Sequence, residues 1–391
     1  MTRVLAVSTA FPPHRYMQDE ITEDLVSGLP PGSDRELVRR LHAATGVESR
    51  HLALPLDRYR DLGTFGETNR LFVELATALG AEAVTRALDD AGVRPEDVDL
   101  VVSTTVTGIA TPSLEARLAA RIGLRPDVRR TPLFGLGCSA GAAGLARVHE
   151  FLDGRPGGIA LLLSTELCSL TLQRADMSTA NLVAGGLFGD GAAALVAAGG
   201  DLPPASSPTT TTTGETATPR TTTGPTTRPT TGPTTGPTPA PARPSASPAP
   251  TVVAARSRLY PGTEHLLGWD VGDWGFRMVL GRELPELVRL HVTEEVESFL
   301  AEHDLKPTDV TAWICHPGGP KILDALADGL GLPDPALAAS RRALAAHGNL
   351  SSASVLQILQ DTQSQPPPPG AIGLLLAFGP GFSSELVLLA W

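Results

Sequence analysis

Residues 131–146 read TPLFGLGCSAGAAGLA, and this stretch carries the first evidence about the fold. It begins as a short strand, turns at Gly135 and Gly137, and continues after Cys138 into a run of small helical residues. Small side chains permit a tight strand-to-helix turn of the kind that exposes a nucleophile. The dipole at a helix N-terminus favours a thiolate and lowers the pKa of a cysteine. Cys138 is therefore a candidate nucleophile, and a buried structural cysteine is the alternative.

The chain around this stretch alternates short apolar runs with segments of helical periodicity. The expected strands are 4–7, 99–106, 131–137, 159–164, 192–197, 310–315, 372–378 and 385–389, and the expected helices are 71–91, 112–122, 140–152, 285–300, 322–330 and 350–359. Apolar strands that alternate with helices predict an α/β fold whose sheets are covered on both faces.

The composition divides the 391 residues into three segments. Of the 35 prolines, 13 lie between residues 201 and 250, together with 17 threonines and almost no large apolar side chain. Such a segment cannot bury enough surface to offset its ordering entropy, so we expect a disordered insertion at 201–250. The flanking segments, 1–200 and 251–391, are expected to be two similar α/β halves of one duplicated fold.

Charge and cysteine content exclude several classes of function. The formal net charge is −11, which argues against a partner with a phosphate backbone. The longest apolar runs are far shorter than the ~18 residues that span a bilayer. The run at 4–7 is too short for a signal-peptide core, and a cytoplasmic location is expected. Three cysteines at this spacing form neither a disulfide framework nor a zinc pattern.

Two later motifs add chemistry to Cys138. His316 follows an apolar strand in WICHPGGP (313–320), and Asn349 precedes a helix in AHGNLSSAS (346–354). Each has an ordinary alternative, a strand-end histidine for His316 and a turn or N-cap asparagine for Asn349. Together with Cys138 they supply a nucleophile, a base and an amide donor, each at the end of an element.

At this point the sequence resembles the type III polyketide synthases, the chalcone-synthase-like family of the thiolase superfamily. The resemblance rests on GCSAG (137–141), LFGDGAAA (187–194), HPGGP (316–320), GNLSSA (348–353) and FGPG (378–381). It covers residues 1–200 and 251–391. The implied fold is a thiolase-like five-layered αβαβα sandwich of two similar halves, and the implied assembly is a homodimer.

The resemblance also implies the chemistry. Cys138 would take an acyl group from an acyl-CoA starter, and His316 would pair with it as imidazolium. His316 and Asn349 would hold the thioester carbonyl of malonyl-CoA while CO2 leaves. The resulting carbanion would lengthen the Cys138-bound chain, which then cyclises to a pyrone, resorcinol or related phenolic. No metal or redox cofactor is required, since the CoA thioesters are substrates.

Further residues match family positions outside the Cys–His–Asn set. Phe188 and Phe276 match the two aromatic gatekeepers, and core packing is the alternative for Phe188. Five residues match positions that shape the product cavity, and all are small or medium-sized: Thr111, Cys168, Thr171, Ala184 and Ser351. Their size predicts a roomy cavity. The Thr111 position would reach across the dimer interface. Arg39, Arg40 and Lys321 are candidate contacts for the CoA phosphates, and the alternative is a solvated charged face.

Three rival functions share part of the pattern. A 3-ketoacyl synthase of fatty-acid type uses the same three residue types but usually carries His-Gln-Ala-Asn around its histidine. A papain-like protease has the same Cys–His–Asn order, but no tryptophan follows Cys138 here. A non-catalytic interaction protein with a Thr/Pro-rich stalk is the third, and the presence of all three chemical residues argues against it.

Overall fold

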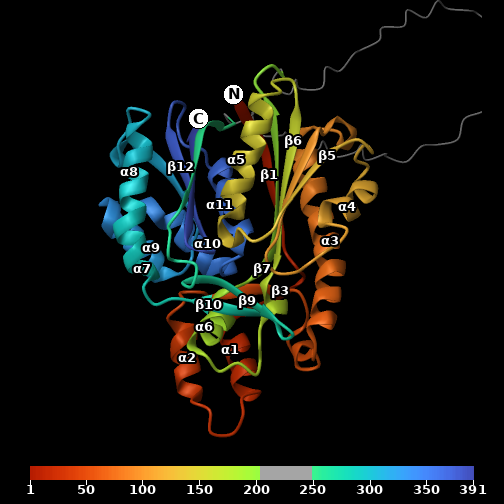
Figure 1. The fold of residues 1–391 in the computed structure, drawn as a ribbon, viewed down its shortest axis with the longest axis vertical. Helices are drawn as coiled ribbons and strands as arrows, with labels where there is room; N and C mark the ends of the chain where they lie inside the picture. The colour runs from red at the N-terminus through yellow and green to blue at the C-terminus, as the bar shows by residue number, and fades with distance from the viewer. Residues whose placement is uncertain (203–248) are drawn as a thin grey trace, which may run out of the picture.

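The computed structural model of the protein describes residues 1–202 and 249–391 (Figure 1). The predicted insertion at 201–250 therefore lies almost wholly outside the described residues. No helix in the described part of the chain is both long and apolar enough to cross a membrane.

The nine principal strands form two halves. In spatial order, the first half contains β1 (Thr2–Ala10), β7 (Asp190–Gly199), β6 (Ile159–Leu167), β4 (Leu100–Thr104) and β5 (Arg129–Leu133), and the second contains β8 (Thr251–Leu259), β13 (Ser383–Ala390), β12 (Ile372–Gly379) and β11 (Val310–Cys315). Strands β1 and β8 connect the halves through only two residue pairs, Thr2 with Val252 and Arg3 with Thr251.

Helices cover both halves and fill the space between them (Figure 1). The outer layer of the first half is α3 (Phe65–Ala91) with α4 (Leu114–Ile122); the central layer is α5 (Ala140–Asp153), α10 (Ala338–His347) and α11 (Ser354–Ser364); the outer layer of the second half is α7 (Leu284–Leu287), α8 (Thr293–Ala301) and α9 (Pro320–Leu330). The order is helix, sheet, helix, sheet, helix, so the expected five-layered α/β sandwich is confirmed.

Alternation along the strands explains why every layer has an apolar contact surface. In β6, Leu161 and Leu163 enter the core under α3, whereas Leu162 enters the central core around α5 and α11. In β12, Leu374 faces the outer core of the second half and Leu375 faces the central core. Successive strand residues point to opposite faces of the sheet. A sheet with helices packed on both faces therefore requires a continuous apolar run along each strand.

A smaller layer lies beneath the sheets in Figure 1 and was not predicted. It consists of α1 (Gln18–Ser27), α2 (Arg35–Ala43), α6 (Thr179–Leu187), the hairpin of β9 (Leu267–Gly272) and β10 (Gly275–Leu280), and the short pair β2 (His14–Met17) and β3 (Ser49–Leu52). Helix α6 contacts both α2 and β10. This layer closes the lower side of the candidate site.

Some expected helix limits were wrong. The helix expected at 285–300 is present and runs from Leu284 to Ala301, with a π-helical turn at Val288–Val292. The helix expected at 350–359 begins at Ser354, because residues Ser351–Ala353 form a separate tight turn. Helix α3 begins at Phe65, six residues before its expected start, with Thr64 as its N-cap. The Thr64 hydroxyl accepts from the Glu67 amide, which satisfies one of the unpaired donors of the first turn.

Gly141 in α5 tests how closely the central layer is packed. A Cβ at Gly141 would lie 2.2 Å from the Ser352 carbonyl oxygen, whereas a Cβ at Gly66 in α3 meets nothing within 4 Å. We expect Gly141→Ala to lower the free energy of unfolding by about 1–3 kcal/mol through overpacking. We expect Gly66→Ala to raise it by up to about 1 kcal/mol, since alanine is the better helix former. Urea unfolding of both variants measures whether each change lowers or raises the free energy of unfolding. A higher free energy of unfolding for Gly141→Ala would contradict the close approach of Gly141 to Ser352.

Candidate active site

Cys138 lies in a single tight turn, Gly137–Ser139, between β5 and α5. Gly137 has a φ of 50°, and a Cβ there would lie 2.4 Å from the Cδ atom of Pro380. A Cβ at Gly379 would lie 2.5 Å from the Leu136 carbonyl oxygen. The FGPG segment near the C-terminus therefore packs directly on the cysteine turn, and glycine is needed on both sides of that contact.

His316 directly follows β11 and is almost completely buried. Its backbone amide donates to the Leu376 carbonyl at 2.8 Å, so the residue is held in register with β12. Its Nε2 atom lies 3.4 Å from Nδ2 of Asn349. Its Nδ1 atom has no hydrogen-bond partner among the described residues.

Asn349 is positioned by the chain on either side of Phe188. Its amide donates to the Leu187 carbonyl at 2.8 Å, and its carbonyl accepts from the Gly189 amide at 3.0 Å. Its side-chain Oδ1 accepts from the Ser351 amide at 2.8 Å, which is the turn geometry considered as an alternative for this residue. Because Oδ1 is occupied in this way, Nδ2 is the atom left to face His316.

Ser351 connects the cysteine to the other two residues. The Cys138 thiol donates to Ser351 Oγ at 3.5 Å, and the Ser351 amide holds Asn349. Ser351 itself has a φ of 51°, an uncommon conformation for a residue with a side chain. The structure thus brings Cys138, Asn349 and His316 together, with Ser351 between the thiol and the amide.

Burial holds both titratable groups in their neutral forms. It raises the pKa of Cys138 to about 12, with a contribution from the nearby Glu166 carboxylate, and it lowers the pKa of His316 to about 3. The expectation of a lowered pKa at the helix N-terminus is not met, because desolvation disfavours the charged form of each group. An isolated thiolate or an isolated imidazolium is therefore unfavourable at this site.

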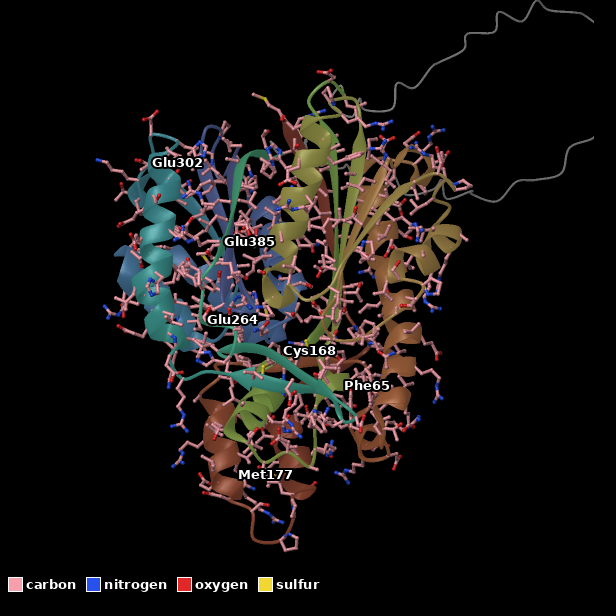
Figure 2. The ribbon with its side chains drawn as sticks, viewed as in Figure 1. Phe65, Cys168, Met177, Glu264, Glu302 and Glu385 are labelled. Atoms are coloured by element: carbon pink, nitrogen blue, oxygen red, sulfur yellow. The ribbon has the colours of Figure 1, made fainter. Side chains whose placement is uncertain are left out.

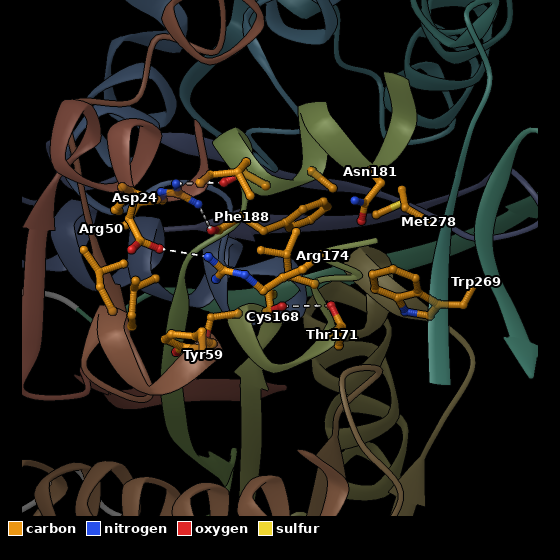
Figure 3. A pocket seen from close by; sticks show the side chains of 18 residues that line it. Asp24, Arg50, Tyr59, Cys168, Thr171, Arg174, Asn181, Phe188, Trp269 and Met278 are labelled. Atoms are coloured by element: carbon orange, nitrogen blue, oxygen red, sulfur yellow. Dashed lines mark hydrogen bonds and ion pairs between the residues drawn. The ribbon is translucent and has the colours of Figure 1, made fainter. Parts of the chain in front are cut away.

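A small cavity is lined in part by Cys168, which lies at the level of the β9–β10 hairpin in Figure 2, and Figure 3 shows the lining side chains. Four of the predicted site residues line it: Cys168, Thr171, Ala184 and Phe188. Ser351 contacts Cys138 instead of the cavity, and Thr111 is exposed on the surface. Phe188 lines the cavity and pairs through its backbone with Asn349, so the cavity adjoins the three chemical residues at that point.

The three residues predicted to bind CoA do not form one cluster through hydrogen bonds or ion pairs among the described residues. Arg39 donates through Nε to Glu23 at 2.7 Å, so this arginine already has a carboxylate partner. Arg40 and Lys321 are exposed, the latter in the first turn of α9. The loop after α2 approaches that turn, since a Cβ at Gly46 would lie 3.3 Å from Pro320. A role for these cations in CoA binding stays a prediction.

The comparisons with known proteins agree with this geometry. Residues 1–201 match the N-terminal domain of chalcone and stilbene synthases, and residues 251–390 match the C-terminal domain. The chain belongs to the chalcone and stilbene synthase family. It is 50% identical to a 1,3,6,8-tetrahydroxynaphthalene synthase of Streptomyces peucetius subsp. caesius, over all of this chain and 93% of that one.

Two further relatives lie at greater distance. A putative chalcone synthase of Bacillus subtilis is 32% identical over 100% of this chain and 99% of its own length. The crystal structure of 1,3,6,8-tetrahydroxynaphthalene synthase from Streptomyces coelicolor, a bacterial type III polyketide synthase, superimposes with a TM-score of 0.84 at 29% identity. That match covers 100% of this chain and 99% of the other. The protein is a type III polyketide synthase, as the resemblance implied.

The predicted second gatekeeper does not line the cavity of this synthase. Phe276 is buried against Phe65, with ring centroids 5.4 Å apart and the rings nearly perpendicular. From the same hairpin, Trp269 and Met278 line the cavity instead. Phe276 and Met278 share one face of β10, but Phe276 is nearer the hairpin turn and meets the start of α3.

Glu166 is a residue of the site that sequence reasoning missed. It lies one residue before the end of the apolar strand β6, is completely buried, and accepts from the Val106 amide at 3.1 Å and the Thr107 hydroxyl at 2.8 Å. It also accepts from the Ser352 hydroxyl. Burial raises the pKa of this carboxyl group. A lone acidic residue inside the run IALLLSTEL (159–167) was the available signal, because an unpaired buried charge is costly and rarely incidental.

Proposed function

We propose that this type III polyketide synthase makes 1,3,6,8-tetrahydroxynaphthalene from malonyl-CoA alone. The observation that carries the proposal is the 50% identity to the Streptomyces peucetius synthase along the whole chain. The ten carbons of a naphthalene equal five two-carbon units, each left when a malonyl group loses CO2. The balanced reaction consumes five malonyl-CoA and releases five CoA, five CO2 and one water with each product.

The first half-reaction loads Cys138. Because burial penalises a thiolate and an imidazolium separately, we propose that the two charges form together when the thiol proton passes to His316. The thiolate then attacks the carbonyl carbon of the starter thioester, and the departing CoA thiolate takes that proton. The starter remains bound to Cys138 as a thioester.

The second half-reaction lengthens the chain. A malonyl-CoA loses CO2 and leaves an enolate, whose oxygen accepts hydrogen bonds from Asn349 Nδ2 and from His316 Nε2 in its protonated tautomer. The enolate carbon attacks the thioester carbonyl on Cys138 and displaces the thiolate, so the lengthened chain is now carried by CoA. No step transfers an electron to or from the protein, so we propose that no metal or redox cofactor takes part.

The cavity supports a short starter. Its volume is about 50 Å³, and bulky side chains line it, among them Tyr59, Trp269 and Met278. The roomy cavity expected from small residues at Cys168 and Ala184 is not found, since neighbours from the hairpin and from Leu56–Arg60 occupy the space. A three-carbon malonyl group suits this cavity better than a long fatty acyl chain.

The test is product formation from malonyl-CoA as the single substrate. We expect the purified enzyme to give tetrahydroxynaphthalene, identified by mass spectrometry, with CoA and product released in a ratio of five to one. Product that appears only after an acyl-CoA starter is added would contradict the proposal. A six-carbon phenol from malonyl-CoA alone would also contradict it, because it would leave the chain two units short.

We also propose that the enzyme is a homodimer that pairs through β5. This strand is an edge of the sheet, and its side chains are largely exposed. Phe134 is 56% exposed and Ile109 is 43% exposed near this edge. Exposed apolar side chains beside an unpaired edge favour a second strand there. Light scattering should give twice the 40.7 kDa of one chain, and a monomeric mass would contradict the proposal.

The cytoplasmic location stays a prediction.

A further inference from the structure

We propose that Arg174 selects the starter by binding the carboxylate that a malonyl group carries and an acetyl group lacks. The inference rests on the proposed function, which uses malonyl-CoA as starter. Three ordinarily charged side chains line the cavity: Arg50, Arg174 and Asp24 (Figure 3). Their formal charges sum to +1. A cavity of this kind is suited to an anionic group at the end of the growing chain.

Arg174 is the cavity cation with donors to spare. Its Nη2 donates to Asp24 Oδ2 at 3.1 Å, and that is the single partner of its guanidinium among the described residues. The side chain is 26% exposed, so it is partly buried and still accessible to a ligand. A guanidinium carries five N–H donors in a planar fork that matches a carboxylate. One contact therefore leaves an edge of the fork for a ligand.

Arg50 cannot take this role. Each of its three guanidinium nitrogens already donates, Nε to the Gln18 side chain at 3.1 Å, Nη1 to the Phe188 carbonyl at 2.5 Å and Nη2 to the Gly185 carbonyl at 2.8 Å, and the residue is only 2% exposed. Burial lowers the pKa of Arg50 to about 10. Arg50 therefore supports the backbone beside Phe188, and Arg174 remains as the cation that can meet a chain end.

The Arg174 guanidinium is held in position from one side. Asp24 is only 11% exposed and also binds Arg60, so its carboxylate is fixed between two arginines. A Cβ at Gly28 would lie 3.4 Å from Arg174 Nη2, which shows how closely α1 approaches this guanidinium. A pre-positioned guanidinium loses less freedom when it binds a carboxylate.

The loop that carries Arg174 is held as well. Asn181 in α6 donates to the Gln173 carbonyl at 2.8 Å and to the Asp176 carbonyl at 2.7 Å. The Gln173 side chain donates to the Phe276 carbonyl at 3.3 Å and so joins the loop to β10. Side-chain donors of Asn181 and Gln173 thus hold the loop on both sides of Arg174, as a specificity site requires.

The carboxylate has a chemical purpose in the proposed reaction. A malonyl-primed chain keeps its carboxylate at the end remote from the thioester. Loss of that group as CO2 leaves a carbanion on the adjacent carbon, which can attack a carbonyl and close a ring. The bond to the carboxylate carbon breaks, and its electron pair stays on the adjacent carbon and forms the new ring bond. The attacked carbonyl releases its thiolate if it is the thioester, or loses water after proton transfer if it is a ketone. An ion pair with Arg174 would hold the chain end in place until this step.

The experiment compares malonyl and acetyl starters, which differ by one carboxylate. In Arg174→Gln we expect formation of the naphthalene product from malonyl-CoA to fall by on the order of 10-fold or more, the scale of a lost charge-assisted hydrogen bond. Pyrones primed by deuterated acetyl-CoA and extended by malonyl-CoA should change less than about 2-fold. Arg174→Lys should recover part of the malonyl-primed rate, because it keeps the charge.

Arg60→Gln is the matched control, since Arg60 binds the same Asp24 and does not line the cavity. It should leave the ratio of the two products unchanged. Equal losses for both starters in Arg174→Gln would overturn the inference, as would an unchanged ratio. A wild-type enzyme that makes no naphthalene from malonyl-CoA alone would instead overturn the proposed function itself.

Discussion

Cys138→Ala is expected to abolish chain extension, with a loss of at least about 10³-fold in product formation, because Cys138 is the thiol that Ser351 joins to Asn349 and His316. Cys168 lines the cavity and Cys315 faces the outer core, and burial raises the pKa of both thiols as it does for Cys138. The variant should still release CO2 from malonyl-CoA, since decarboxylation uses His316 and Asn349. Retained decarboxylation with lost condensation would separate removal of the nucleophile from loss of the fold.

Cys315→Ala serves as the matched control for this prediction. Cys315 precedes His316 on β11 and faces the outer core, away from the Cys138 turn. We expect it to keep product formation within a few-fold of the wild type. Labelled acyl-CoA should acylate the control variant and leave Cys138→Ala unlabelled. Covalent label on Cys138→Ala would show that a different residue is the nucleophile.

Asn349→Ala is expected to slow decarboxylation of malonyl-CoA by about 10²-fold or more, which is the usual effect of removing a donor to a developing oxyanion. Its Nδ2 lies beside His316 Nε2, so both nitrogens can donate hydrogen bonds to the same enolate oxygen. Acylation of Cys138 by labelled starter should continue, because the thiol and His316 remain. Asn349→Ala should therefore lose decarboxylation and keep acylation, whereas Cys138→Ala should keep decarboxylation and lose acylation.

Asn69→Ala controls for the loss of an asparagine. Asn69 binds the Ile109 backbone through both side-chain atoms at the surface, away from His316. Its variant should decarboxylate malonyl-CoA at nearly the wild-type rate. Equal decarboxylation rates in Asn349→Ala and the wild type would remove Asn349 from the mechanism.

Sequence patterns were sufficient for the layers of the fold because the signal is local. The apolar runs at 159–164 and 372–378 indicate strands buried on both faces, and the structure contains β6 and β12 there. Local irregularities depended on contacts that the pattern does not contain. The helix expected at 285–300 widens to a π-helical turn at Val288–Val292, where it packs on α9, and the periodicity gives no sign of that turn.

The cavity was harder to predict than the three chemical residues. Cys138, His316 and Asn349 each lie in a short motif that contains glycine, GCSAG, HPGGP and GNLSSA, so each motif is visible in the sequence. The β9–β10 hairpin supplies Trp269 and Met278, yet its polar, glycine-rich sequence has no clear period. Which of its side chains reach the cavity depends on how the hairpin sits on α6 and α3.

The sequence by itself determined an α/β chain of two halves, a cysteine at a strand-to-helix turn, and the histidine and asparagine that accompany it. Tertiary structure decided the environment of those groups. It buried Glu166 near the thiol, raised the pKa of Cys138, and set Arg174 beside Asp24 in a cavity smaller than its small residues implied. The reason is that desolvation, ion pairing and cavity size are sums over neighbours from distant segments, whereas strand periodicity and turn glycines are properties of adjacent residues.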